Sequence, residues 1–182
     1  MLGLEQDASR VATASLAYPS LTLVAGGLEQ LRGEALVVRI ANVGRGLSRD
    51  AAAELHERVV ATLVDGGVCL EGSTDLEGHV STFWVLRRRG GSVRREALVF
   101  HTDGARGFSP WLFRDVLPRD LRRDVRPGTA VHQLLTGWTT SWERCRTGAA
   151  LESFEASVRA LAELRPDVDA HLIVDGFCVW QQ

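Results

Sequence analysis

Apolar and polar residues alternate in two early segments of the chain, and alternation with a period of two is typical of half-buried strands. The pattern predicts strands over residues 20–24 and 35–40. After Ser48, a suitable N-cap, apolar residues recur at every third or fourth position. This spacing predicts a helix over about 49–65, which Gly66-Gly67 is expected to end.

The middle of the chain has the pattern of consecutive strands. A short strand is predicted over 68–71 and a longer one over 79–88. Arg89-Gly90-Gly91-Ser92 is typical of a tight hairpin turn, because glycine readily takes a positive φ. The partner strand of this hairpin is predicted over 93–101.

Proline and glycine divide the following section into helical segments. Pro110 and Pro118 each favour the start of a short helix. A third helix is expected near 130–136, and Gly137 is expected to end it. The pattern over 138–146 leaves both strand and helix open.

The end of the chain predicts a helix over 149–165, ended by Pro166, and a closing strand over 171–180. Residues 4–16 are expected to form a short helix, loosely packed or frayed, within an N-terminal segment 1–18. The order of elements predicts a single α+β domain. We expect a mainly antiparallel sheet with helices packed on one face, built from a ferredoxin-like β-α-β-β core plus a helical section.

The chain contains no lysine, so all 21 basic side chains are arginine. A GC-rich genome accounts for this bias, but the chemical consequence holds in any case. Without a side-chain amine there is no Schiff base to pyridoxal phosphate, and the lysine of a phosphate-binding P-loop is missing. We expect no cofactor.

The net charge and the spacing of cysteine and histidine also limit the classes of function that the chain could have. A formal charge of −2 argues against nucleic acid as a partner, and no run of 18 apolar residues predicts a membrane span. The acidic start is unlike a signal peptide, so we expect a cytoplasmic protein. Three cysteines without C-x-x-C spacing argue against a disulfide framework or zinc ribbon. The five histidines show no metal-binding spacing, no metal site is expected, and His56 is expected to be solvated.

The arginines are unevenly distributed. Residues 87–126 hold eleven arginines and five carboxylates, an excess of six positive charges. Guanidinium groups bind carboxylates and phosphates well, so Arg87, Arg89 and Arg94 around the predicted hairpin are candidate ligand-binding residues. The alternative is a solvated hairpin tip whose charge protects a sheet edge.

Two further groups of residues are candidates for chemistry. Trp138, Trp142 and Arg144 share one face if their segment is a strand, and could line a ligand pocket beside Glu143. The alternative is a pair of core or rim tryptophans. His101 and Asp103 end a predicted strand, where a histidine oriented by a carboxylate could act as a general base. An ordinary Asp-Gly turn is the alternative there.

Four elements share their order with a known domain: Pro19-Ser20-Leu21-Thr22-Leu23, Ala35-Leu36-Val37-Val38-Arg39, the helix ending at Gly66-Gly67, and Leu76-Glu77-Gly78-His79 before the next strand. Through them residues 19–88 resemble the small C-terminal domain of pyridoxal-phosphate-dependent group II decarboxylases, those of the aromatic amino acid and glutamate type. The resemblance implies a fold fragment and no site residue, because the family's cofactor lysine lies in a large domain that has no counterpart here. A weaker resemblance is to chorismate pyruvate-lyases. The segments that carry it are Asp65-Gly66-Gly67, Leu117-Pro118-Arg119 and Gly128-Thr129-Ala130-Val131-His132-Gln133-Leu134-Leu135.

Three functions remain open. The leading hypothesis is an accessory or ligand-binding protein of a bacterial biosynthetic pathway, recognising an anionic small molecule or an acidic protein surface through the arginines. The second is a small cofactor-independent lyase or isomerase, in which arginine holds a carboxylate substrate and His101, Asp103 or Glu143 moves a proton. The third is a dimerisation module in which an exposed strand at 171–180 or 93–101 pairs with a second copy.

Overall fold

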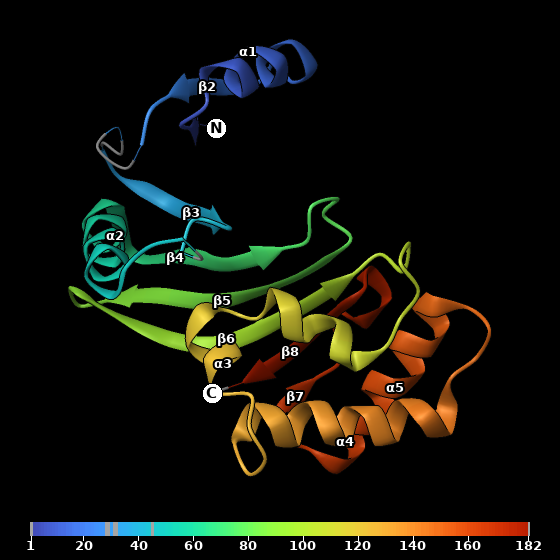
Figure 1. Cartoon of the computed structure of the whole chain (residues 1–182). Helices are drawn as coiled ribbons and strands as arrows, with labels where there is room; N and C mark the ends of the chain where they lie inside the picture. Colours follow the sequence, from blue (N-terminus) through green and yellow to red (C-terminus); the bar gives the residue numbers. More distant parts are fainter. Residues whose placement is uncertain (1, 28–29, 31–32, 45, 182) are drawn as a thin grey trace.

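The computed structural model describes residues 2–27, 30, 33–44 and 46–181. Within this part of the chain the predicted α+β class is confirmed: six strands form one mixed sheet, and two more form a separate pair, β1-β2 (Figure 1). The strand order of the large sheet is β3-β4-β5-β6-β8-β7.

The predicted strands and helices correspond closely to the observed ones. The strands of the large sheet are β3 (Ala35–Ala41), β4 (Leu63–Thr74), β5 (Val80–Arg89), β6 (Ser92–Thr102), β7 (Val168–Asp169) and β8 (Phe177–Gln181). The helices that follow β3 are α2 (Arg49–Thr62), η2 (Pro110–Val116), α3 (Arg119–Arg123), α4 (Ala130–Cys145), α5 (Ala150–Leu164) and η3 (Ile173–Asp175), of which η2 and η3 are 3₁₀ helices.

The sheet is mainly antiparallel, as predicted. The exception is β3-β4, a parallel pair joined by the crossover helix α2. In a ferredoxin-like split β-α-β unit the two parallel strands flank a third strand, whereas β3 and β4 pair directly, so that detail is not confirmed. The predicted β5-β6 hairpin is present, and its turn residues Gly90 and Gly91 have φ of 55° and 79°. Glu96 is an extra residue in β6, because the pairing steps from Val85–Ala97 to Leu86–Arg95.

One face of the sheet packs against helices and forms the core. Phe100 of β6 lies against Phe113 of η2 and Trp138 of α4, with ring centroids 5.2 and 5.5 Å apart. Trp138 is wholly buried and its Nε1 donates to Ser157 Oγ of α5 at 2.9 Å. On the same face Thr82 donates to the carbonyl of Val116. The expected one-sided packing of helices is therefore confirmed.

Three boundaries in the large sheet and its helices differ from the prediction. Gly137 lies inside α4, because the buried stripe of Val131, Leu134 and Trp138 continues across it and outweighs the helix propensity of glycine, which is about 1 kcal/mol poorer than that of alanine. Gly66-Gly67 lies inside β4, which begins immediately after α2. Residues 171–180 contain η3 as well as β8, because Gly176 turns the chain at a φ of 76°.

The two strands proposed for pairing with a second copy both lie inside the sheet. β6 is paired on both sides, by β5 and β8, and β8 lies between β6 and β7. The strands at the two edges of the sheet are β3 and β7. β8 pairs only with residues 97–101 of β6, so residues 93–96 pair with β5 alone. Dimerisation through an edge of these segments stays a prediction.

The N-terminal segment forms a small β-α-β unit of β1 (Leu2–Glu5), α1 (Ala8–Ala17) and β2 (Thr22–Ala25), with the two strands parallel. The helix predicted over 4–16 therefore begins only at Ala8, after a strand. Asp7 caps α1 by accepting from the backbone N–H of Ser9 and Arg10. Figure 1 shows the unit beyond the β3 edge, and no residue from 2 to 25 is buried. None of the helices in the described part of the chain is both long and apolar enough to cross a membrane.

Candidate functional site

A cavity of about 330 Å³ opens between α2, strands β4 to β6, and α3. We call it the α2–α3 cavity. Crossover helix α2 and helix α3 bring residues far apart in the sequence to one place on the helix-covered face of the sheet. Its lining residues are Gly44, Ala52, His56, Glu71, Gly72, Ser73, Trp84, Arg95, Pro118, Arg119, Asp120 and Arg123.

A histidine and a carboxylate face each other in this cavity. His56 on α2 has its Nε2 2.5 Å from Glu71 Oε2 on β4. The hydrogen bond that His56 donates to Glu71 raises the pKa of His56, and burial and the charge of Arg95 partly offset this effect. The pair therefore favours a protonated imidazolium, held by a carboxylate whose side chain is 18% exposed.

A second ion pair, between Arg95 and Asp120, lines the same cavity, and both side chains contact the indole ring of Trp84. The guanidinium carbon of Arg95 lies 4.7 Å from the ring centre of Trp84, which is 2% exposed. Arg95 also pairs with Asp120 at 2.7 Å, and Trp84 Nε1 donates to the same carboxylate at 3.3 Å. The Trp84 ring thus fixes both charged groups at the cavity wall.

Two further guanidiniums make the cavity electropositive. Each carboxylate there is paired with a cation, Glu71 with His56 and Asp120 with Arg95. Arg119 and Arg123 also line the cavity, and within the described residues neither has a carboxylate at salt-bridge distance. Arg119 donates to the carbonyl of Leu47 and so connects α3 to the loop before α2. Among the described residues, the cavity therefore holds two guanidiniums that no carboxylate neutralises.

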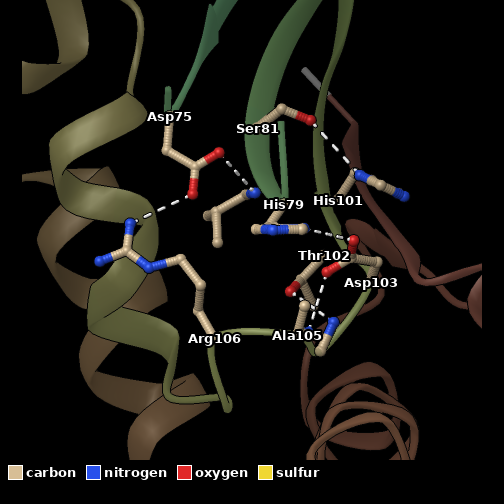
Figure 2. A network of polar contacts seen from close by, with 10 residues as sticks. Asp75, His79, Ser81, His101, Thr102, Asp103, Ala105 and Arg106 are labelled. Atoms are coloured by element: carbon tan, nitrogen blue, oxygen red, sulfur yellow. Dashed lines mark hydrogen bonds and ion pairs between the residues drawn. The ribbon is translucent and has the colours of Figure 1, made fainter. Parts of the chain in front are cut away.

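The predicted histidine–aspartate pair exists with a different histidine. Asp103 accepts from His79 Nδ1 at 2.7 Å, not from His101 (Figure 2). The hydrogen bond raises the pKa of His79, whereas burial lowers the pKa of His101. His101 packs against Phe177, with ring centres 4.5 Å apart, and approaches Ser81 Oγ at 3.5 Å.

The carboxylate of Asp103 also serves the turn that follows it, as the alternative interpretation expected. Its Oδ1 accepts from the backbone N–H of Ala105 at 2.9 Å, and this bond lowers the pKa of Asp103. Nearby, Asp75 binds Arg106 at 3.1 Å and accepts from the Val80 N–H at 3.2 Å (Figure 2). This network ties the loop after β6 to the loop before β5.

The predicted ligand-binding arginines do not converge on the α2–α3 cavity. Arg87 and Arg89 bind Glu96 at 2.8 and 3.1 Å, on the opposite face of the sheet. Arg94 lies opposite Arg87 in the strand register of the hairpin, and its side chain is exposed. Arg88 donates to the carbonyls of Val60 and Leu63 and so caps the C-terminal end of α2.

The 137–145 segment is helical, so its side chains do not alternate as in a strand. Trp138 is core, and Trp142 is half-buried with Arg146 over its ring at 5.1 Å. Glu143 and Arg144 are exposed on α4. They line neither the α2–α3 cavity nor a second opening, which Asp75, His79 and Arg106 line.

Sequence reasoning missed His56, Glu71 and Trp84. The helix pattern placed His56 next to the buried Leu55, which was a signal of partial burial, but nothing local pointed to Glu71 on a strand 15 residues away. The excess of arginine over 87–126 did include Arg95, Arg119 and Arg123.

A scan against family models found no match for the chain, and a search of curated proteins also found none. The function must therefore be argued from the site itself. No group of three or more His, Cys, Asp or Glu side chains among the described residues is placed to hold a metal ion.

Proposed function

We propose that the protein binds an anionic small molecule, a carboxylate or a phosphate, in the α2–α3 cavity. The volume of about 330 Å³ lies at the lower end of the range for small-molecule pockets. The observation that carries the proposal is the convergence of Arg119 and Arg123, both without a carboxylate partner among the described residues, on a cavity that His56 also lines. A guanidinium gives an anion charge-assisted, often bidentate hydrogen bonds.

The size and charge of the cavity limit its ligand. Two unneutralised guanidiniums favour a ligand with one or two negative charges. The ring of Trp84 is already covered by Arg95, so recognition through charge is favoured over stacking on the indole. An accessory or ligand-binding role in a bacterial biosynthetic pathway accords with such a site.

The test compares two neighbouring arginines on α3. Arg123 lines the cavity, whereas Arg122 does not, and both are exposed. A thermal-shift screen with small carboxylates and phosphates, inorganic phosphate included, identifies a ligand, and titration calorimetry gives its Kd. We expect Arg123→Gln to weaken binding about tenfold, because it removes a charge-assisted hydrogen bond.

Arg122→Gln is the matched control, since it removes the same charge from the same short helix outside the cavity. Its Kd should stay within about twofold of the wild-type value. Equal losses for Arg122→Gln and Arg123→Gln would show that only net charge matters. No binding of any carboxylate or phosphate in the screen would remove the proposal.

A lyase or isomerase is the second candidate, and the His56–Glu71 pair favours it. The imidazole and the guanidiniums open on one cavity, as proton transfer to a bound carboxylate substrate requires. The test follows hydrogen–deuterium exchange at the carbon atoms of a bound carboxylate in D₂O by NMR. Exchange that is lost in His56→Gln supports catalysis, and a ligand that binds without exchange argues for binding alone.

A further inference from the structure

The face of the sheet opposite the helices is apolar at its centre. Side chains alternate between the two faces of each strand, so the neighbours of the buried core residues point the other way. At this second face, here called the open face, the central side chains are partly exposed. They are Val68, Leu70, Phe83, Val85, Val99, Phe177 and Val179.

Guanidiniums lie at the centre and at one end of the open face. Arg39 of β3 lies over the ring of Phe83 at the apolar centre, at 5.2 Å, and Arg87, Arg89 and Arg94 surround the β5-β6 turn. Two carboxylates lie near the turn, Glu96, which binds Arg87 and Arg89, and Asp65, which accepts from the N–H of Gly90. Four guanidiniums against these two carboxylates leave an excess of two positive charges.

Two other titratable groups on this face lie away from these guanidiniums or add little charge. Asp169 lies on β7, at the opposite edge of the sheet, where it accepts from the backbone N–H of His171. His101 has a pKa lowered by burial, which favours its neutral form. The field over the centre and the β5-β6 end of the open face is therefore positive.

This charge pattern selects the kind of partner. A second copy applied face to face through a twofold axis would bring like guanidinium clusters into one interface, and like charges disfavour such a contact. A bare sheet face is the surface on which proteins pack amphipathic helices. We infer that the open face binds an amphipathic helix of another protein, with apolar residues toward the sheet and acidic residues over Arg39, Arg87 and Arg94.

The first test uses designed peptides. One labelled peptide forms an amphipathic helix with leucine on one face and glutamate on the other, and its partner peptide has lysine in place of every glutamate. Fluorescence anisotropy should show binding of the glutamate peptide, weaker at high salt, and no binding of the lysine peptide. Equal binding of both peptides, or binding of neither, would overturn the inference.

The second test changes the charge at the centre of the open face. Val99 is half-buried and pairs with Phe83 on one side and Val179 on the other. Val99→Asp and Val99→Lys both remove the apolar side chain and differ in the sign of the charge that they introduce. Circular dichroism checks that both variants fold. We expect the glutamate peptide to bind Val99→Asp about tenfold more weakly than Val99→Lys.

Three outcomes contradict the inference directly. Equal affinity of Val99→Asp and Val99→Lys shows that charge does not select the partner. Self-association in sedimentation that Val99→Asp abolishes shows that a second copy covers the face. Binding to phosphatidylglycerol vesicles without binding to the glutamate peptide assigns the face to a lipid surface. The ligand of the α2–α3 cavity should retain its Kd in both Val99 variants, because that cavity lies on the other side of the sheet.

Discussion

At the scale of single residues, the surroundings of a histidine in the folded chain decide how its pKa is shifted. His56 and His101 are both on regular elements, but a carboxylate at 2.5 Å raises the pKa of His56 whereas burial lowers that of His101. The sequence pattern indicated His101 as a candidate base and His56 as a solvated side chain. The partner of His56 comes from a different strand, and only the folded chain shows it.

The pH dependence of stability should reveal the His56–Glu71 pair. Because the folded pKa of His56 is raised above its ordinary value of 6.5, its contribution is fully present below about pH 6.5 and is lost as pH rises through the folded pKa. Replacing His56 with Gln should lower Tm by about 1–3 °C near pH 5.5 and by less near pH 9. Glu71→Gln should remove the same pH dependence, and a Tm difference that does not change with pH would refute the assignment.

At the scale of elements, the sequence pattern was sufficient to predict those strands and turns whose conformation depends on neighbouring residues alone. Alternation located β3, β5 and β6, and the paired glycines located their hairpin, because a positive φ is a local requirement. The pattern was insufficient at Gly137, where burial of Trp138 and Leu134 keeps α4 continuous. The packing of α4 against α5 is a long-range contact, and the helix propensities of single residues do not include such contacts.

Gly137→Ala should therefore stabilise the protein. A Cβ at this position would meet Leu161 Cδ1 at 3.9 Å, an ordinary contact, and alanine is favoured over glycine within a helix by about 0.5–1 kcal/mol. A thermal melt should show Tm raised by about 1–4 °C. Gly72→Ala is the contrasting variant, since its Cβ would lie 1.8 Å from the Thr82 carbonyl, and it should lower Tm. A decrease in Tm for Gly137→Ala would mean that α4 is strained there.

At the scale of the whole molecule, the fold class could be predicted from the order of elements, but the candidate site could not. The α2–α3 cavity depends on β3 and β4 pairing directly, which brings α2 over Trp84, and on α3 returning across the sheet after η2. These placements follow from the collective packing of the core. The arginine excess over 87–126 indicated an anion-binding region, and the fold divides it between the cavity and the open face.

The division between the N-terminal unit and the main domain gives a prediction for the whole molecule. Among the described residues, every buried member of the hydrophobic core lies at Ile40 or beyond, and no residue from 2 to 25 is fully buried. A chain that starts at Glu34 should therefore keep the six-stranded sheet, with Tm within about 3 °C of the full chain and unchanged Kd for a cavity ligand. Circular dichroism melts and calorimetry measure both quantities. A shortened chain that loses its cooperative melt would show that the β1-α1-β2 unit is part of the folding domain, because its removal would then expose a surface that the core needs covered.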